Sequence, residues 1–225
     1  MDAEGFRKLI DAGDTDGLRA ALTSDPEWAN RSIVWYLNQR NESDPLHYVC
    51  DSVVNVGLAE DRAAKVAALL LEFGAEIEGS PGRESPLIAA TSLGVAGVAQ
   101  LLVEAGADIE ATALFGARPL HWAAYLGLPT TVETLLDRGA AIEAKCTEFG
   151  ATPLFWSAHA FRTQRPEKYQ ALIAAAKVLI AAGARVDPTN KDGMTAAQCA
   201  RRAKSPDLYE LLRQHSDEEQ AGRTR

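Results

Sequence analysis

The three cysteines and four histidines of this sequence can act as nucleophiles, bases or metal ligands. Cys146 and His159 could form a catalytic pair, in which the thiol is the nucleophile and the imidazole is its base. Nothing in the sequence supplies the orienting carboxylate or the oxyanion hole that such a pair needs. No Gly-x-Ser-x-Gly, His-Glu-x-x-His, P-loop or Gly-x-Gly-x-x-Gly pattern is present. The spacing of Cys50, Cys146 and Cys199 fits neither a zinc site nor a disulfide framework. We therefore predict no enzymatic activity, no cofactor and no metal.

Charge and composition exclude other classes of protein. The chain has 225 residues, a formal net charge of −8 and a sequence pI near 5.1, which argues against nucleic-acid binding. It lacks the roughly 18 consecutive apolar residues of a membrane span, and its acidic N-terminus predicts no signal peptide. We therefore expect a cytoplasmic protein. Alanine and leucine fill 65 positions and aromatic residues only 7%, which predicts a mostly helical fold.

A short motif recurs along the chain, in which proline opens an apolar segment. Copies begin at Pro45, Pro86, Pro119 and Pro153, and a degenerate copy has Ala196 in the place of proline. Successive copies are 41, 33, 34 and 43 residues apart. Proline suits the first turn of a helix, where its missing N–H needs no partner. Each copy therefore predicts the beginning of a helix.

A second motif runs in step with the first and has the pattern Leu-Leu-x-x-Gly-Ala-x-Ile-Glu. Its glycines are Gly74, Gly106, Gly139 and Gly183. Each follows an apolar run, at the place where a helix commonly ends in a left-handed residue. Each proline motif therefore opens one helix, and each glycine motif closes the next one.

Two motifs in fixed phase resemble the ankyrin repeat family, whose signature is Thr-Pro-Leu-His-x-Ala at a period of 33 residues. The resemblance covers about residues 5–215. It implies an all-α ankyrin-repeat solenoid, in which helix-turn-helix units with hairpin fingers stack in a single domain over 1–215. The implied boundaries are an N-terminal helical cap over 1–31, repeats over 32–80, 81–112, 113–146 and 147–189, a C-terminal cap over 190–215, and a polar tail over 216–225.

The sequence departs from the family pattern in several segments. Residues 6–29 show helical spacing without the repeat signature and are predicted to form the capping helix pair, whereas residues 31–44 are predicted to be irregular. Extra residues at about 51–61 and 160–168 are predicted insertions between the two helices of their repeats. A short final helix around Leu208–Leu212 is predicted to precede a frayed tail.

The resemblance also assigns roles to individual side chains. His47 and His121 occupy the slot in which the family hydrogen-bonds the neighbouring finger. Cys50 and Cys199 take small-residue helix positions and are expected to be buried, while Cys146 lies near a finger, where we expect exposure. Trp122 and Trp156 share one slot in adjacent repeats and are expected to pack between helices. Each glycine motif ends in an acid, where many family members carry Asn; this row is either a contact strip for a basic partner or merely solvated. The four acids are Glu78, Glu110, Glu143 and Asp187.

The predicted function is non-catalytic binding of a protein partner through the concave face and the finger tips. Exposed apolar and aromatic side chains mark interaction surfaces, and Phe115 and Phe149 stand one repeat apart on adjacent fingers. Residues 1–110 carry 19 acidic and 8 basic side chains, a net −11, against +3 for residues 111–225, so the expected partner has a basic patch. The predicted partner-binding residues are Leu93, Phe115, Tyr125, Leu126, Phe149 and His159, with Glu84 and Glu148 as a polar rim.

Two alternatives stay open. One is a small-ligand binder or an enzyme with a pocket beside the inter-helix insertions, which a deep pocket with converging polar side chains would favour. The other is a homo-oligomeric regulatory subunit, whereas our first expectation is a monomer that contacts neither nucleic acid nor membrane.

Overall fold

The computed structural model describes residues 1–36 and 40–223. The chain divides into two compact units, Met1–Asp108 and Ile109–Arg225, and each is described by itself. The unit boundary lies close to the predicted repeat boundary at 112/113. That residues 1–215 form a single domain stays a prediction.

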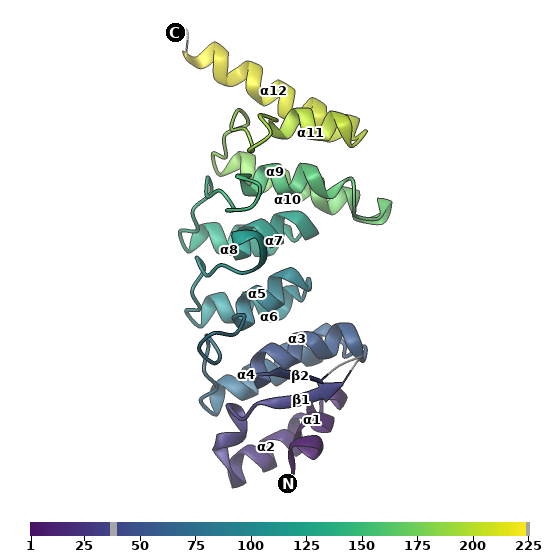
Figure 1. Cartoon of the computed structure of the whole chain (residues 1–225), viewed down its shortest axis with the longest axis vertical. Coiled ribbons are helices and arrows are strands. Elements are labelled where there is room, and N and C mark those ends of the chain that lie inside the picture. The colour runs from purple at the N-terminus through teal and green to yellow at the C-terminus, as the bar shows by residue number, and fades with distance from the viewer. Residues whose placement is uncertain (37–39, 224–225) are drawn as a thin grey trace. The chain divides into compact units, whose positions relative to one another are not determined.

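The first unit pairs its helices antiparallel, as the motifs predict (Figure 1). Residues 6–29 form the expected N-terminal helix pair, and the side chains of Asp2 and Asp14 cap its two helices by accepting from Gly5 N and Gly17 N. The helices of this unit are α1 (Ala3–Ala12), α2 (Thr15–Ser24), α3 (Pro45–Asn55), α4 (Glu60–Glu72), α5 (Pro86–Ser92) and α6 (Ala96–Glu104), with the 3₁₀ turn η1 (Pro26–Ala29).

The prediction of an irregular segment over 31–44 is wrong for the part that the structure describes. Strands β1 (Ile33–Tyr36) and β2 (Arg40–Ser43) pair antiparallel, with Ile33 opposite Ser43; residues 37–39 lie outside the described residues. The first strand reads Ile-Val-Trp-Tyr, and such β-branched and aromatic residues favour extended backbone. Ile33 is buried, and Trp35 contacts the Tyr48 ring and donates to Ser43 Oγ. This packing holds the hairpin against α1 and α3.

The second unit repeats the same helix pairing (Figure 1). Its helices are α7 (Pro119–Leu126), α8 (Pro129–Asp137), α9 (Pro153–Ala160), α10 (Tyr169–Ala181), α11 (Ala196–Arg202) and α12 (Pro206–Arg223), with the 3₁₀ turns η2 (Leu114–Gly116) and η3 (Pro166–Lys168). The predicted short final helix and frayed tail are wrong. Helix α12 has 18 residues and continues through the predicted tail to Arg223, since that stretch contains no proline and several good helix formers.

Both motifs act as the sequence indicates. The leucine after each motif proline is buried, with Leu46, Leu87, Leu120 and Leu154 at most 2% exposed. The motif glycines adopt φ values between 83° and 94°, a left-handed conformation that glycine enters without steric cost. The mostly helical architecture of repeated helix pairs is therefore confirmed, with one added β-hairpin.

The two insertions fold differently. In the first unit the extra residues lengthen α3 to 11 residues, against 7 for the equivalent α5, and the remainder forms a short loop before α4. In the second unit α9 ends at Ala160, and the insertion forms a loop that includes η3. This second loop borders the cavity described below.

The histidines of the repeat motif join adjacent repeats, as the resemblance implies. The ring of His47 lies 3.2 Å from Glu84 O through Nδ1. His121 Nε2 donates to Ala151 O at 3.1 Å, while its Nδ1 accepts from Arg118 N at 3.2 Å. The bond at Nδ1 requires a neutral ring, because a protonated Nδ1 cannot accept, and burial lowers the pKa of His121 from its ordinary 6.5 to about 4.

The acids that close the glycine motifs take part in the stack. Glu78, Glu110 and Glu143 each accept a backbone N–H from the next repeat, from Asp108 at 2.7 Å, Ala141 at 2.8 Å and Arg185 at 2.7 Å respectively. These three acids are thus not merely solvated, and their use as a contact strip for a basic partner stays a prediction.

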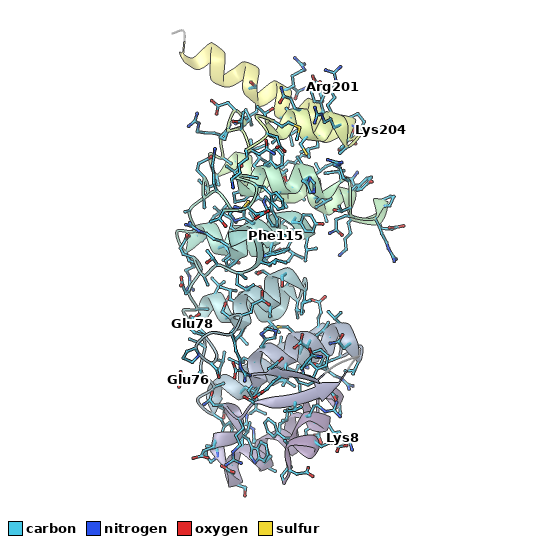
Figure 2. The ribbon with its side chains drawn as sticks, viewed as in Figure 1. Lys8, Glu76, Glu78, Phe115, Arg201 and Lys204 are labelled. Atoms are coloured by element: carbon cyan, nitrogen blue, oxygen red, sulfur yellow. The ribbon has the colours of Figure 1, made fainter. Side chains whose placement is uncertain are left out.

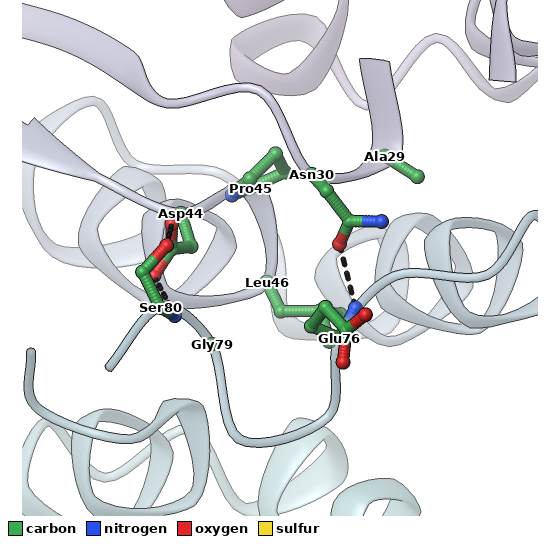
Figure 3. A pocket seen from close by; sticks show the side chains of 8 residues that line it. All are labelled: Ala29, Asn30, Asp44, Pro45, Leu46, Glu76, Gly79 and Ser80. Carbon is green, nitrogen blue, oxygen red and sulfur yellow. Dashed lines mark hydrogen bonds between the residues drawn. The ribbon is translucent and has the colours of Figure 1, made fainter. Parts of the chain in front are cut away.

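Asparagine plays this role at the start of the first unit (Figure 3). Asn30 Oδ1 accepts from Glu76 N at 2.6 Å. In the same region Asp44 accepts from the backbone N and the hydroxyl of Ser80, at 2.7 and 2.6 Å. The space among these groups is about 20 Å³, room for about one water molecule. These polar groups therefore serve to join repeats.

Candidate aromatic binding site

The structure gathers four of the predicted site residues around one cavity in the second unit. Phe115, Tyr125, Phe149 and His159 all line this space of about 400 Å³. Leu126 is half-buried and Glu148 is exposed, both outside the lining. The remaining two, Leu93 and Glu84, are exposed residues of the first unit and do not belong to this cavity.

The fingers fix the positions of the two phenylalanines. Phe115 lies at the centre of η2 with φ 65°, one of two non-glycine residues with positive φ in the described chain; Figure 2 labels it. Its carbonyl accepts from Glu148 N at 3.0 Å and from Thr147 Oγ1 at 3.2 Å. One repeat later, Phe149 O accepts from Lys191 N at 2.9 Å. Finger-to-finger hydrogen bonds therefore align the two rings, whose centroids lie 5.2 Å apart.

Three further rings form the helical wall of the cavity. Trp122 and Trp156 meet edge to face, with centroids 5.0 Å apart and planes at 81°. Tyr125 stands edge-on to both, with centroids 6.3 and 5.7 Å away. Phe115 lies 6.3 Å from each tryptophan. The five rings make one continuous aromatic surface, which we call the aromatic cluster: Phe115, Trp122, Tyr125, Phe149 and Trp156.

The two tryptophans do not share one role, although the sequence suggests it. Trp156 is 5% exposed, and its Nε1 donates to Cys146 Sγ at 3.4 Å, so it packs as expected. Trp122 is half-buried, and its Nε1 has no acceptor among the described residues. Both rings nevertheless line the cavity. Besides packing between helices, both tryptophans therefore form part of the cavity wall.

Exposure corrects two more expectations. Cys146 is buried, at 1% exposure, rather than exposed near its finger, and it does not line the cavity. Tyr125 and His159 are half-buried rather than in open slots; the Tyr125 hydroxyl shares a hydrogen bond of 2.8 Å with Thr163 Oγ1. Phe115 and Phe149 remain 37% and 43% exposed. The exposed rings of the site therefore lie on the fingers.

Polar side chains from two loops also line the cavity. Arg162 comes from the loop after α9, and Asn190 and Asp192 come from the last finger. Asn190 Oδ1 accepts from the backbone N of Asp192 and of Met194, at 3.1 and 2.9 Å. Burial, together with the nearby Arg162 charge, lowers the pKa of His159. The site thus combines apolar rings with one cation and one carboxylate.

Sequence reasoning missed Phe155, Arg162, Asn190, Asp192 and Met194. One feature of the sequence indicates an aromatic site in this segment. Six of the 15 aromatic residues fall between positions 115 and 156, which is more than a helical core built from alanine and leucine needs. The last finger gave no comparable signal, because Asn190 and Asp192 also suit an ordinary turn.

The part of the chain that the structure describes holds no group of three His, Cys, Asp or Glu side chains that could bind a metal. None of its helices has the length and hydrophobicity of a membrane span.

Comparison with known families identifies the class of protein. A family model described as "Ankyrin repeats (3 copies)" matches residues 56–146 and 120–224. The chain belongs to the ankyrin repeat family and has its all-α solenoid fold. Ankyrin repeats are generally protein–protein interaction modules.

Proposed function

We propose that this chain binds a protein partner, without catalysis, through the aromatic cluster and the finger tips of its second unit. The observation that carries the proposal is the pair of exposed rings, Phe115 and Phe149, beside a cavity of about 400 Å³. Aromatic side chains next to a concavity are favoured anchors in interfaces. Leu114 adds apolar surface on the same finger, at 63% exposure.

Backbone strain at Phe115 supports the same site. A bulky residue at φ 65° is an outlier, and such conformations cost about 1–3 kcal/mol and persist where the surroundings over-determine them. Glycine would be unstrained at this position, yet the chain places there a ring that contacts Trp122, Phe149 and Trp156. The strain is consistent with a binding role for this ring.

The proposed contact surface also includes the four predicted residues that do not line the cavity. Leu126 and Glu148 belong to the second unit and would border the aromatic cluster. Leu93 and Glu84 would contribute a separate contact on the first unit. In this proposal the chain binds its partner as a monomer.

Binding energies of single-site variants test the proposal. Intact chain immobilised as bait captures a partner from native lysate, and calorimetry with the purified partner then measures affinity. We expect Phe115→Ala, Tyr125→Ala and Phe149→Ala each to weaken binding by at least about 1 kcal/mol. Lys177→Ala, at an exposed residue of α10 that lies outside the cavity and outside both insertions, is the control. Unchanged affinity in all three cluster variants would place the surface elsewhere, with the insertions at 51–61 and 160–168 as the next candidates.

The cavity itself favours a second function, binding of a small ligand. Its volume lies within the range of about 300–1,000 Å³ that is typical of small-molecule sites, and Arg162 belongs to the insertion that the sequence singled out. Native mass spectrometry of the freshly purified chain discriminates the two functions. A bound molecule that Phe115→Ala releases would favour the small ligand, and a dimer mass would favour the homo-oligomeric subunit.

A further inference from the structure

Three polar side chains of the cavity have no hydrogen-bond or ion-pair partner among the described residues. The Arg162 guanidinium is exposed, and the half-buried His159 ring can both donate and accept when neutral. The Trp122 indole N–H is buried and also lacks an acceptor. A buried donor without a partner costs free energy. An occupant that brings acceptors would therefore gain more here than one that brings donors.

The acceptors of the cavity are partly engaged already. Asn190 Oδ1 accepts two backbone N–H groups, and the Asp192 carboxylate accepts from Asn190 Nδ2 at 3.4 Å. Arg162 and Asp192 come from different loops and form no ion pair in the described structure. An anionic group in the cavity would therefore be attracted by Arg162 and repelled by Asp192.

Arg162 and His159 stand together. His159 lies in the last turn of α9, and Arg162, just after the helix, donates its backbone N–H to His159 O at 3.0 Å. Arginine suits carboxylates because its planar fork can donate two parallel hydrogen bonds to them. The aromatic cluster lines the same cavity and provides faces for a large apolar side chain.

We propose, on the basis of the proposed function, that the cavity receives a segment of the partner in which an Asp or Glu stands next to a large apolar side chain. The apolar side chain packs against the aromatic cluster, and the carboxylate pairs with Arg162. The occupant is a peptide segment rather than a free acid, because the phenylalanines that border the cavity are exposed on adjacent fingers, over which a backbone can lie. At this cavity the partner is acidic, in contrast to the basic patch that the net charge of the first 110 residues predicts.

A random peptide library displayed on phage and selected on the intact chain tests the chemistry. We expect enriched sequences to pair Asp or Glu with a neighbouring Trp, Phe, Leu or Met. The strongest sequence is then synthesised as the probe, together with a version whose carboxylate residue is replaced by its amide. We expect the amide version to bind at least about tenfold more weakly.

Two variants of the chain locate the interaction. Arg162→Gln should bind the probe and its amide version alike, because it removes the cation that distinguishes them. Arg165→Gln is the matched control, since Arg165 is an exposed arginine in the same loop but outside the cavity. Phe115→Gly, checked for unchanged helicity by circular dichroism, should lose at least about tenfold in affinity for both peptides.

The outcomes separate the inference from the proposed function. If Phe115→Gly abolishes binding while the amide version and Arg162→Gln change nothing, the acidic preference is wrong and the binding site stands. Enrichment of Lys or Arg would also overturn the acidic preference. If Phe115→Gly binds normally, or no sequence is enriched, both proposals are wrong. Free N-acetylphenylalanine that binds as tightly as the probe would contradict a peptide occupant.

Discussion

The two units follow the same repeat plan but use their distinctive side chains differently. In the first unit, acids are abundant and many of them hold structure: Asp44 binds Ser80, Glu78 binds the next repeat, and Glu72 pairs with Arg19. In the second unit, aromatic residues crowd together, and two of them remain exposed beside a cavity. A surplus of charge on a repeat protein therefore need not mark its binding surface. Apolar rings that the core leaves exposed are the more direct indication.

Core substitutions at matched positions should give the largest effects and test whether the two units share one type of packing. Leu87 in α5 and Leu120 in α7 both follow the motif proline and are at most 2% exposed. We expect Leu87→Ala and Leu120→Ala each to lower the free energy of unfolding by about 2–5 kcal/mol, measured by urea denaturation. A loss below about 1 kcal/mol at either position would show that this leucine is not a core residue.

The buried histidine of the second unit should make stability depend on pH. His121 has a pKa of about 4 when folded against 6.5 ordinarily, so the unfolded chain binds its proton first as the pH falls. The free energy of unfolding should therefore be unaffected by this group above pH 6.5 and decrease by about 3 kcal/mol between pH 6.5 and pH 4. His121→Asn should flatten this part of the pH profile. Leu120→Ala, destabilised but with His121 intact, should keep the slope, and an identical slope in His121→Asn would assign it to other groups.

The positive φ of Phe115 predicts that a glycine at this position is more stable than an alanine, the reverse of the usual order. Alanine keeps the cost of positive φ and loses the ring contacts, whereas glycine loses the same contacts without that cost. We expect Phe115→Gly to be more stable than Phe115→Ala by about 1 kcal/mol in urea denaturation. At Leu114, outside the left-handed region, the corresponding glycine variant should be the less stable of the two. Equal stabilities of the two Phe115 variants would argue against strain.

The smallest effect concerns the acids of the glycine motif. Glu78 accepts from Asp108 N at an exposed site, so Glu78→Ala should cost about 0.5–1 kcal/mol. Glu78→Gln keeps an acceptor oxygen and should stay near the original stability. If Gln were as destabilising as Ala, the charge rather than the hydrogen bond would be the contribution of this residue.

The sequence by itself determined the repeats. Pro119 and Leu120 fix where a helix begins and which side chain enters the core, Gly139 fixes where the next helix ends, and His121 joins neighbouring repeats. These features are local, or recur at a fixed period, so residue type and spacing are enough to predict them. The exposed fingers with Phe115 and Phe149 were predicted for the same reason.

Only the tertiary structure decided what gathers around the cavity. Trp122 shares a slot with Trp156, yet the Trp156 indole N–H has a sulfur acceptor, whereas that of Trp122 has no acceptor among the residues that the structure describes. Arg162 and Asp192 are 30 residues apart in the sequence and line the same space. The hairpin and the full length of α12 lie outside the repeat pattern, so periodicity did not predict them, although the local residue types favour both. Periodicity specifies the helix face on which a residue lies. The length of an insertion and the path of a loop decide which side chains from different repeats come into contact. A cavity formed by residues from several repeats therefore follows from the fold and not from any one motif.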